Sequence, residues 1–79
     1  MILAVRIFTD PFALSRRILD EGGEERWQTL GRVEGYLLLL VAHTIREEEQ
    51  DGTAIEIIRI ISARKADKKE RRRYEQETR

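Results

Sequence analysis

One stretch constrains the fold more than any other. In Ala54–Tyr74 a run of β-branched residues leads directly into a block of Lys and Arg. The first part, Ile55–Ala63, is rich in isoleucine and lacks glycine and proline, which predicts a buried strand. The second part predicts a helix, because Asp67 can cap its N-terminus and Glu70 can reach back to the Asp67 N–H in a capping box. Arg64 lies at the junction, where a strand end holds a side chain firmly.

Alternation along this strand assigns its side chains to two faces. One face is expected to carry Ile57, Arg59, Ile61 and Ala63, and the other Ile58, Ile60, Ser62 and Arg64. Isoleucine on both faces predicts a central position in the sheet. Arg59 then needs solvent, a carboxylate or an anion, because an unpaired buried charge is costly.

Three earlier segments are also expected to be strands, which gives an α+β fold: a small antiparallel four-stranded meander followed by a C-terminal helix. The three segments are Ala13–Leu19, Glu24–Val33 and Tyr36–Thr44, the last of them apolar on both faces and therefore central. The connections are expected as a loop at 20–23, a hairpin turn at Glu34-Gly35 and a charged hairpin tip, Ile45–Thr53, that closes at Asp51-Gly52. A long, mobile ribbon is the alternative for this last segment. The apolar segment Met1–Phe8 slightly favours a strand, although one helical turn would also fit.

Composition limits the class of protein. The 79 residues are enough for one small domain, 1–79, with a marginal core that an oligomer or partner would stabilise. There is no cysteine, and the carboxylates are not grouped with His43 at metal-ligand spacing, so we expect no metal and no other cofactor. Met1–Val5 is not a convincing signal peptide, because Arg6 interrupts it, and Tyr36–Ala42 is too short to span a bilayer, so a cytoplasmic protein without a membrane partner is expected.

The charges are segregated although the formal net charge is zero. Residues 64–79 contain eight basic and four acidic side chains, a local charge of +4. A basic end on a neutral protein suits a polyanion or an acidic partner. A solvated helix with interleaved Glu, Lys and Arg explains the same pattern equally well.

The segment IRIISARKADKKERRRYE, preceded by GEERWQTLGR and LLLLVAHTIRE, resembles BrnT, the ribonuclease toxin of type II toxin–antitoxin pairs. The resemblance covers about residues 8–75. The matching positions are Arg26-Trp27, Gly31-Arg32, Arg59, Ile61–Arg64, Glu70, Arg72 and Tyr74. Family members usually begin with two helices that carry an Asn…Lys-His-Gly-Val-type segment. The match lacks this segment, so we expect either a start codon that was assigned too late or a shortened form. Exposed sheet would then favour a homo-oligomer.

The resemblance implies a fold similar to the RelE/ParE toxins and metal-independent RNA cleavage. It also implies neutralisation by a BrnA-like antitoxin, with which the toxin would bind its own promoter DNA. Metal-free cleavage needs a base, a cation at the phosphate and an acid. Arg64 is the first candidate for the cation, because its planar fork matches phosphate oxygens, and Arg59 is the second.

The acid and base candidates each have a structural alternative. The alternative is a helix cap for Glu70, a packing anchor for Tyr74 and a hydrogen-bonded residue of an apolar strand for His43. The basic side chains around the helix would bind RNA phosphates without sequence choice: Lys65, Lys68, Lys69, Arg71, Arg72 and Arg73. The competing hypothesis is an inactive, shortened toxin that acts as a protein- or DNA-binding module.

Overall fold

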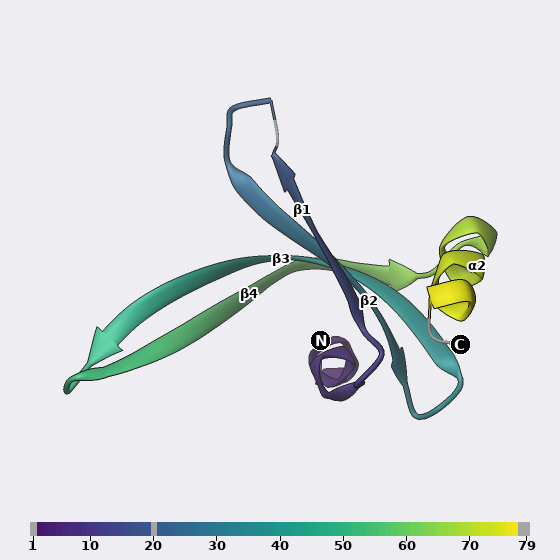
Figure 1. The fold of residues 1–79 in the computed structure, drawn as a ribbon, viewed down its shortest axis with the longest axis horizontal. Coiled ribbons are helices and arrows are strands. Elements are labelled where there is room, and N and C mark those ends of the chain that lie inside the picture. The colour runs from purple at the N-terminus through teal and green to yellow at the C-terminus, as the bar shows by residue number, and fades with distance from the viewer. Residues whose placement is uncertain (1, 20, 78–79) are drawn as a thin grey trace.

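The chain forms one antiparallel sheet with helical segments at both ends (Figure 1). The computed structural model describes residues 2–19 and 21–77, so Met1 and Asp20 of the predicted segments lie outside it. The strands follow each other in the sheet in the order β1 (Leu14–Leu19), β2 (Glu25–Val33), β3 (Leu37–Gln50) and β4 (Thr53–Lys65). The helical segments are α1 (Ile2–Val5), the 3-10 helix η1 (Arg6–Thr9) and α2 (Lys68–Glu77). The predicted α+β meander with a C-terminal helix is confirmed.

Both predicted hairpin turns are present. Glu34 and Gly35 have φ angles of 59° and 80°, and Asp51 and Gly52 have φ angles of 51° and 78°. Glycine adopts such positive angles without steric cost, which is why these dipeptides close hairpins.

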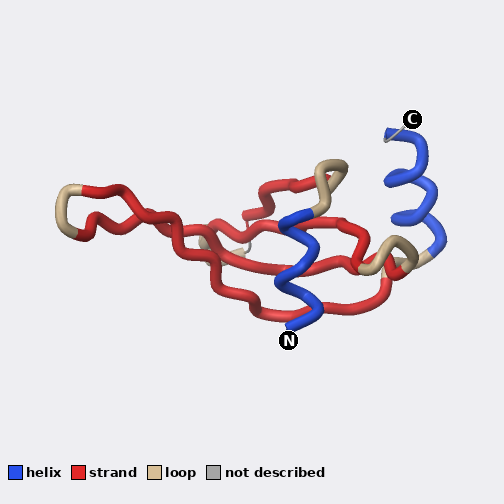
Figure 2. The backbone as a smooth tube through the Cα atoms, turned by 90° about the horizontal axis from the view of Figure 1, so that it is seen from below, coloured by secondary structure: helices blue, strands red, loops and turns tan. Residues whose placement is uncertain are grey.

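The charged segment Ile45–Thr53 was expected as a hairpin tip or a long ribbon that closes at Asp51-Gly52, and the ribbon is confirmed. β3 and β4 stay paired up to Gln50 and Thr53, so that only two residues form the turn. The alternating charges point into solvent from both faces, and they do not interrupt backbone pairing. The result is a long two-stranded ribbon that projects from the body of the molecule (Figures 1 and 2).

The N-terminal segment is helical, so the expected preference for a strand was also wrong. Ala4 and Ile7 lie one turn apart and are buried against Val33, Leu39 and Val41. A Cβ atom at Gly31 of β2 would lie only 2.8 Å from Ile7 Cβ, so glycine at this position lets η1 approach the sheet. The helical segments therefore cover one face of the sheet, which we call the α1 face.

The helix α2 packs on the opposite face, which we call the α2 face. The side chain of Tyr74 is 3 % exposed and lies in a cluster with Leu30, Leu38 and Leu40. Its hydroxyl donates to Oδ2 of Asp10 over 2.6 Å. Docking of α2 through Tyr74 was predicted, and it is confirmed.

Asp10 joins three parts of the chain through one carboxylate. Besides the bond from Tyr74, Oδ2 accepts a 2.8 Å bond from the N–H of Arg32 in β2. Oδ1 accepts a 3.0 Å bond from the N–H of Phe12. Partial burial alone would raise the pKa of Asp10, but these hydrogen bonds lower its pKa overall.

A β-bulge changes the predicted faces of β4. Ser62 pairs with Ala42, but Ile60 pairs with His43, which leaves Ile61 as an extra residue in β4. Directly paired residues share a face. The bulge therefore reverses the alternation, and the prediction of Arg59 and Arg64 on opposite faces was wrong. Both lie on the α2 face, because Arg59 pairs with Thr44 and Arg64 with Leu40.

The predicted central position of the last strand was wrong as well. β4 is an edge strand, whereas β3 lies between β2 and β4 as predicted. Ile60 packs against the α1-face core, while Ile58 and Ile61 remain 37 % and 42 % exposed.

Replacing Tyr74 with Phe removes the hydrogen bond to Asp10 and keeps the aromatic ring. We expect the free energy of unfolding to fall by about 1.5–3 kcal/mol, the usual contribution of a hydrogen bond to a charged group. Chemical denaturation measures it. The difference should shrink at acid pH, because the lowered pKa of Asp10 stabilises the fold only while the carboxylate is ionised.

Tyr36→Phe is the matched control, because Tyr36 is 76 % exposed. Equal stability of the two variants would mean that the Asp10 bond does not contribute to docking of α2.

Candidate nucleic-acid interface

Arginines collect on the α2 face of the sheet. The face of each arginine follows from the strand pairing, because directly paired residues share a face. The α2 face is the one on which Leu30, Leu38 and Leu40 pack against Tyr74. The arginines of this face are Arg16, Arg26, Arg32, Arg46, Arg59 and Arg64. Among the described strands, Glu48 is the one carboxylate on this face, where it lies opposite Ile55. Its side chain pairs with Arg46 at 2.6 Å.

The strand carboxylates lie mainly on the other side. By the same register Glu25, Glu47, Glu49 and Glu56 belong to the α1 face. The chain is therefore neutral overall while its sheet presents a basic face to solvent. An arginine-rich face of this kind suits a polyanion.

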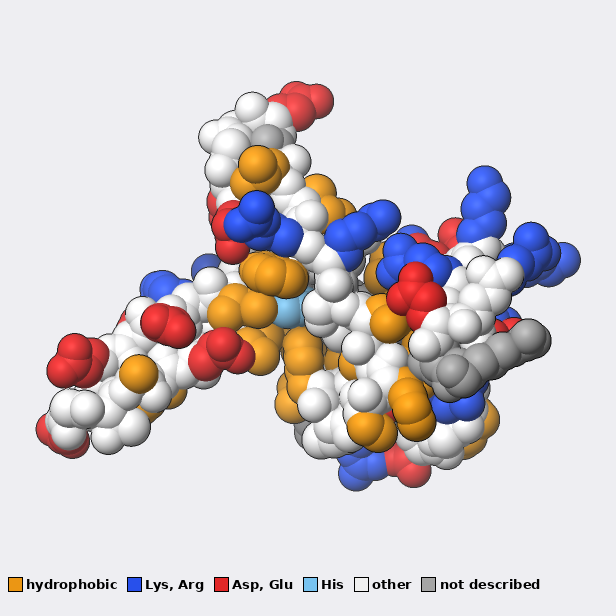
Figure 3. Space-filling model, viewed as in Figure 1, with side chains coloured by type: hydrophobic (Ala, Val, Ile, Leu, Met, Phe, Trp, Pro, Cys, Tyr) orange, Lys and Arg blue, Asp and Glu red, His pale blue; other side chains and the backbone are white. Residues whose placement is uncertain are grey.

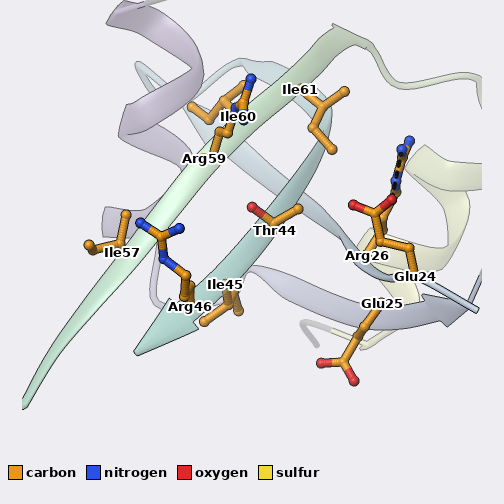
Figure 4. A pocket seen from close by; sticks show the side chains of 10 residues that line it. All are labelled: Glu24, Glu25, Arg26, Thr44, Ile45, Arg46, Ile57, Arg59, Ile60 and Ile61. Carbon is orange, nitrogen blue, oxygen red and sulfur yellow. Dashed lines mark ion pairs between the residues drawn. The ribbon is translucent and has the colours of Figure 1, made fainter. Parts of the chain in front are cut away.

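A groove of about 730 Å³ opens where the two halves of the sheet separate (Figure 4). The pairing of β2 with β3 ends at Trp27 and His43, and beyond this point the β1–β2 and β3–β4 hairpins diverge. The groove is lined by Glu24, Glu25, Arg26, Thr44, Ile45, Arg46, Ile57, Arg59, Ile60 and Ile61. Its walls combine isoleucine side chains with three guanidinium groups.

Arg59 is an exposed cation of this groove. Within residues 2–19 and 21–77 its side chain has no hydrogen bond or ion pair. Arg46 pairs with Glu48, and Arg26 lies 3.7 Å from Glu24 on the opposite wall. Arg59 can therefore accept an anion without first releasing a carboxylate.

Arg64 lies at the junction of strand and helix, as predicted, and its side chain is 55 % exposed. Its Nη1 and Nη2 atoms each donate to Glu70 over 2.8 Å. The bonds from Arg64 lower the pKa of Glu70, and the carboxylate of Glu70 in turn raises the pKa of Arg64.

The predicted capping box is also present. The Asp67 N–H donates to Glu70 over 2.9 Å, and the Glu70 N–H donates to the Asp67 carboxylate over 2.8 Å. Glu70 thus begins α2 and orients Arg64 at the same time. A carboxylate committed to these bonds is a weak proton acceptor.

Tyr74 and His43 are not brought to the groove. Burial and the bond to Asp10 raise the pKa of Tyr74 to about 12, which favours its role as a packing anchor. His43 belongs to the α1 face, where Phe8 lies edge-on to its ring with centroids 5.0 Å apart. The side chain is 1 % exposed.

His43 is held by a short chain of hydroxyl groups. Its Nε2 atom lies 2.7 Å from Thr29 Oγ1, which lies 2.8 Å from Ser15 Oγ. Burial lowers the pKa of His43, and the backbone of Thr44 offsets part of this effect. Nδ1 nevertheless lacks a hydrogen-bond partner of regular geometry in the part of the chain that the structure describes. A protonated ring would therefore be poorly accommodated.

The remaining predicted cations surround α2 (Figure 3). Lys65, Lys68, Lys69, Arg71 and Arg72 are exposed, and Arg73 is half-buried. Arg73 lines a shallow depression together with Arg16 of β1. The cations of α2 extend the basic face beyond the sheet, at the end opposite the ribbon, whereas Lys65 pairs with Leu39 and so belongs to the α1 face.

Several residues of the interface were not predicted from the sequence. Arg16, Arg26 and Arg46 come from three different strands, and no sequence spacing brings them together. Glu24 was seen only as the start of a strand. Asp10 had one visible signal, because an Asp before Pro11 is typical of a turn that accepts backbone hydrogen bonds.

Metal ligands and membrane spans were searched among the described residues. No group of three or more His, Asp or Glu side chains in residues 2–19 and 21–77 could hold a metal ion. Over the same ranges, no helix has the length and apolar character needed to cross a bilayer.

Comparison with known families decides the relationship. The sequence model of the ribonuclease toxin BrnT, of type II toxin–antitoxin systems, matches residues 1–70. The chain belongs to the BrnT family. The match to BrnT begins before the expected residue 8 and ends at Glu70, so Arg72 and Tyr74 lie outside it. No curated protein matches the chain significantly. Membership of this family implies an RNA target and an antitoxin partner.

The buried state of His43 predicts a pH-dependent stability. Its folded pKa is lowered, so the unfolded chain binds a proton first as the pH falls below the ordinary value of 6.5. We expect the free energy of unfolding to decrease from pH 7.5 towards pH 5. This decrease should be absent in His43→Gln.

Chemical denaturation at several pH values measures it, and His43 is the only histidine, so no other imidazole contributes. A wild-type protein as insensitive to pH as the variant would contradict the prediction.

Proposed function

We propose that this BrnT-family protein is a metal-independent endoribonuclease that binds a single RNA strand along the arginine-rich α2 face. The observation that carries the proposal is the bulge at Ile61, because it brings Arg59 and Arg64 to one face. Without the extra residue, the two guanidinium groups would lie on opposite sides of the sheet.

Arg59 and Arg64 contact different phosphates in this proposal. They are five positions apart along an extended strand, which is roughly 15 Å. Arg59 lies in the groove without a partner among the described residues, so it binds the phosphate that is cleaved. Its guanidinium stabilises the charge that develops on the pentacoordinate phosphorus.

Arg64 and α2 hold the flanking RNA. Both terminal nitrogens of Arg64 already donate to Glu70, so Arg64 is less suited to be the main catalytic cation. In this proposal it positions the RNA. The exposed cations of α2 bind further phosphates without sequence choice, and this makes binding strongly dependent on salt.

Proton transfer requires a carboxylate that lines the groove. Glu24 fits, because it lies beside Arg26 on the wall opposite Arg59 (Figure 4). Glu25 lines the same wall but points away from the other side chains in this view. In the proposed reaction Glu24 accepts the 2′-hydroxyl proton and the 2′-oxygen attacks phosphorus. The P–O5′ bond then breaks, the departing 5′-oxygen takes a proton from solvent water, and a 2′,3′-cyclic phosphate remains.

The partners follow from the family. We propose that a BrnA-like antitoxin neutralises the protein, and that the two bind promoter DNA only as a complex. RNA and an antitoxin are encountered in the cytoplasm, which supports that location.

Removing either arginine tests the proposed interface. We expect Arg59→Ala to reduce RNA cleavage about 10²-fold, a typical loss for one transition-state contact. Arg64→Ala should reduce cleavage less and weaken RNA binding. Gel assays in the presence of EDTA measure cleavage, and filter binding measures affinity.

The matched control is Arg17→Ala, an exposed arginine of β1 opposite Trp27 on the α1 face. Equal cleavage by Arg59→Ala and Arg17→Ala would exclude Arg59 from the mechanism. Loss of cleavage in EDTA would exclude a metal-independent reaction.

The role of Glu24 has its own test. Glu24→Gln should lower the cleavage rate about 10²-fold with little change in RNA affinity, because only proton transfer is lost. Glu49→Gln, on the distant ribbon, should leave cleavage unchanged. A Glu24→Gln protein with the wild-type rate would require another base.

A non-enzymatic binding module is the second candidate. The occupied Arg64 fork favours it, since a guanidinium already paired with Glu70 offers less to a reacting phosphate. RNA or antitoxin binding without cleavage by the wild-type protein would establish this alternative.

A further inference from the structure

The two edges of the sheet are protected very differently. β1, one edge, has six residues and carries Arg16 and Arg17. β4, the other edge, has thirteen residues. Natural proteins protect sheet edges with short strands, charges, prolines or bulges. β4 has a bulge and the cations Arg64 and Lys65 near its C-terminal end, and the charged residues of its first half are Glu56 and Arg59.

The first half of β4, Thr53–Ile60, has the composition of an interior strand. It has isoleucine on both faces and contains no proline, glycine or lysine. Yet no strand formed by residues 2–19 and 21–77 lies beside its outer backbone groups. The ribbon also projects away from both helices, which leaves this edge accessible (Figures 1 and 2). A missing neighbour would explain both the composition and the open edge.

We propose that the missing neighbour is β4 of a second copy, paired antiparallel about a twofold axis, so that two four-stranded sheets become one. The axis stands perpendicular to the sheet, and each residue then lies opposite a residue of the same face. This proposal does not depend on ribonuclease activity.

The charges of β4 permit this pairing in only a narrow set of registers. An axis at Glu56 would oppose two carboxylates, and an axis at Arg59 would oppose two guanidinium groups, both of which are destabilising. An axis at Ile57 or at Ile58 instead places isoleucine opposite every charged side chain of this segment. Both registers end at the bulge at Ile61, where regular pairing is interrupted.

The self-complementary register favours a second copy over an unrelated strand. In the register centred on Ile58, this residue, which is 37 % exposed, lies opposite Ile58 of the second copy, and in the register centred on Ile57 the two Ile57 side chains lie opposite each other. The twofold axis also keeps both α2 faces on the same side of the joined sheet. The arginines of two copies would then form one continuous basic surface.

Single cysteines test the pairing directly, because the chain contains none. Antiparallel neighbours have Cα atoms about 4.5–5.5 Å apart, within the range that a disulfide spans. We expect Ile57→Cys or Ile58→Cys to form a disulfide-linked dimer at least tenfold faster than Glu47→Cys under mild oxidation. Glu47 is the control because it is exposed on β3 of the same ribbon.

Light scattering of the full, cysteine-free chain gives the second measurement. We expect a dimer at 100 μM, and a folded monomer for Ile58→Lys, because lysine at the centre of the edge blocks pairing. A monomeric wild type, a dimeric Ile58→Lys, or equal cross-linking at positions 47, 57 and 58 would each overturn the proposal. RNA cleavage by monomeric Ile58→Lys tests the proposed function separately.

Discussion

A single extra residue in β4 decides what the sheet can present to a ligand. Side chains of a strand alternate between two faces, and one inserted residue exchanges the faces of everything that follows. The bulge at Ile61 exchanges them between Arg59 and Arg64, so both guanidinium groups reach the α2 face. The groove and the basic helix then lie on one continuous surface, and the proposed RNA interface depends on this continuity.

The helix α2 belongs to this surface only because it is anchored. Apart from Tyr74 it has almost no apolar side chain, so burial alone cannot hold it against the sheet. Tyr74 fills the space beside Leu38 and Leu40, and its hydroxyl bonds to Asp10. Because the same carboxylate also bonds to β2, one residue near the N-terminus fixes the position of a helix near the C-terminus. The anchored helix can then begin beside Arg64, where Glu70 both caps it and orients the guanidinium.

The separation of charge by face explains how a neutral chain can bind a polyanion. On the α2 face the strands carry arginines and almost no carboxylates. Glu47, Glu49 and Glu56 of the same strands project from the other face of the ribbon. The net charge of the whole chain does not reveal this arrangement. His43 and Tyr74 are both buried and support the fold, whereas the exposed cations remain accessible to a ligand.

Local rules of the chain were enough for the strands, the turns and the capping box. Glycine at Gly35 and Gly52 accepts the positive φ angle, and Asp67 and Glu70 satisfy each other's backbone across three residues, so these features need no distant contact. The family also followed from the sequence. Tertiary structure decided the rest: the bulge that joins Arg59 to Arg64, the position of β4 at an edge, the helical N-terminus over Gly31 and the partner of Tyr74. Each of these depends on packing between segments far apart in the chain, and a local pattern contains no information about which neighbour will be there.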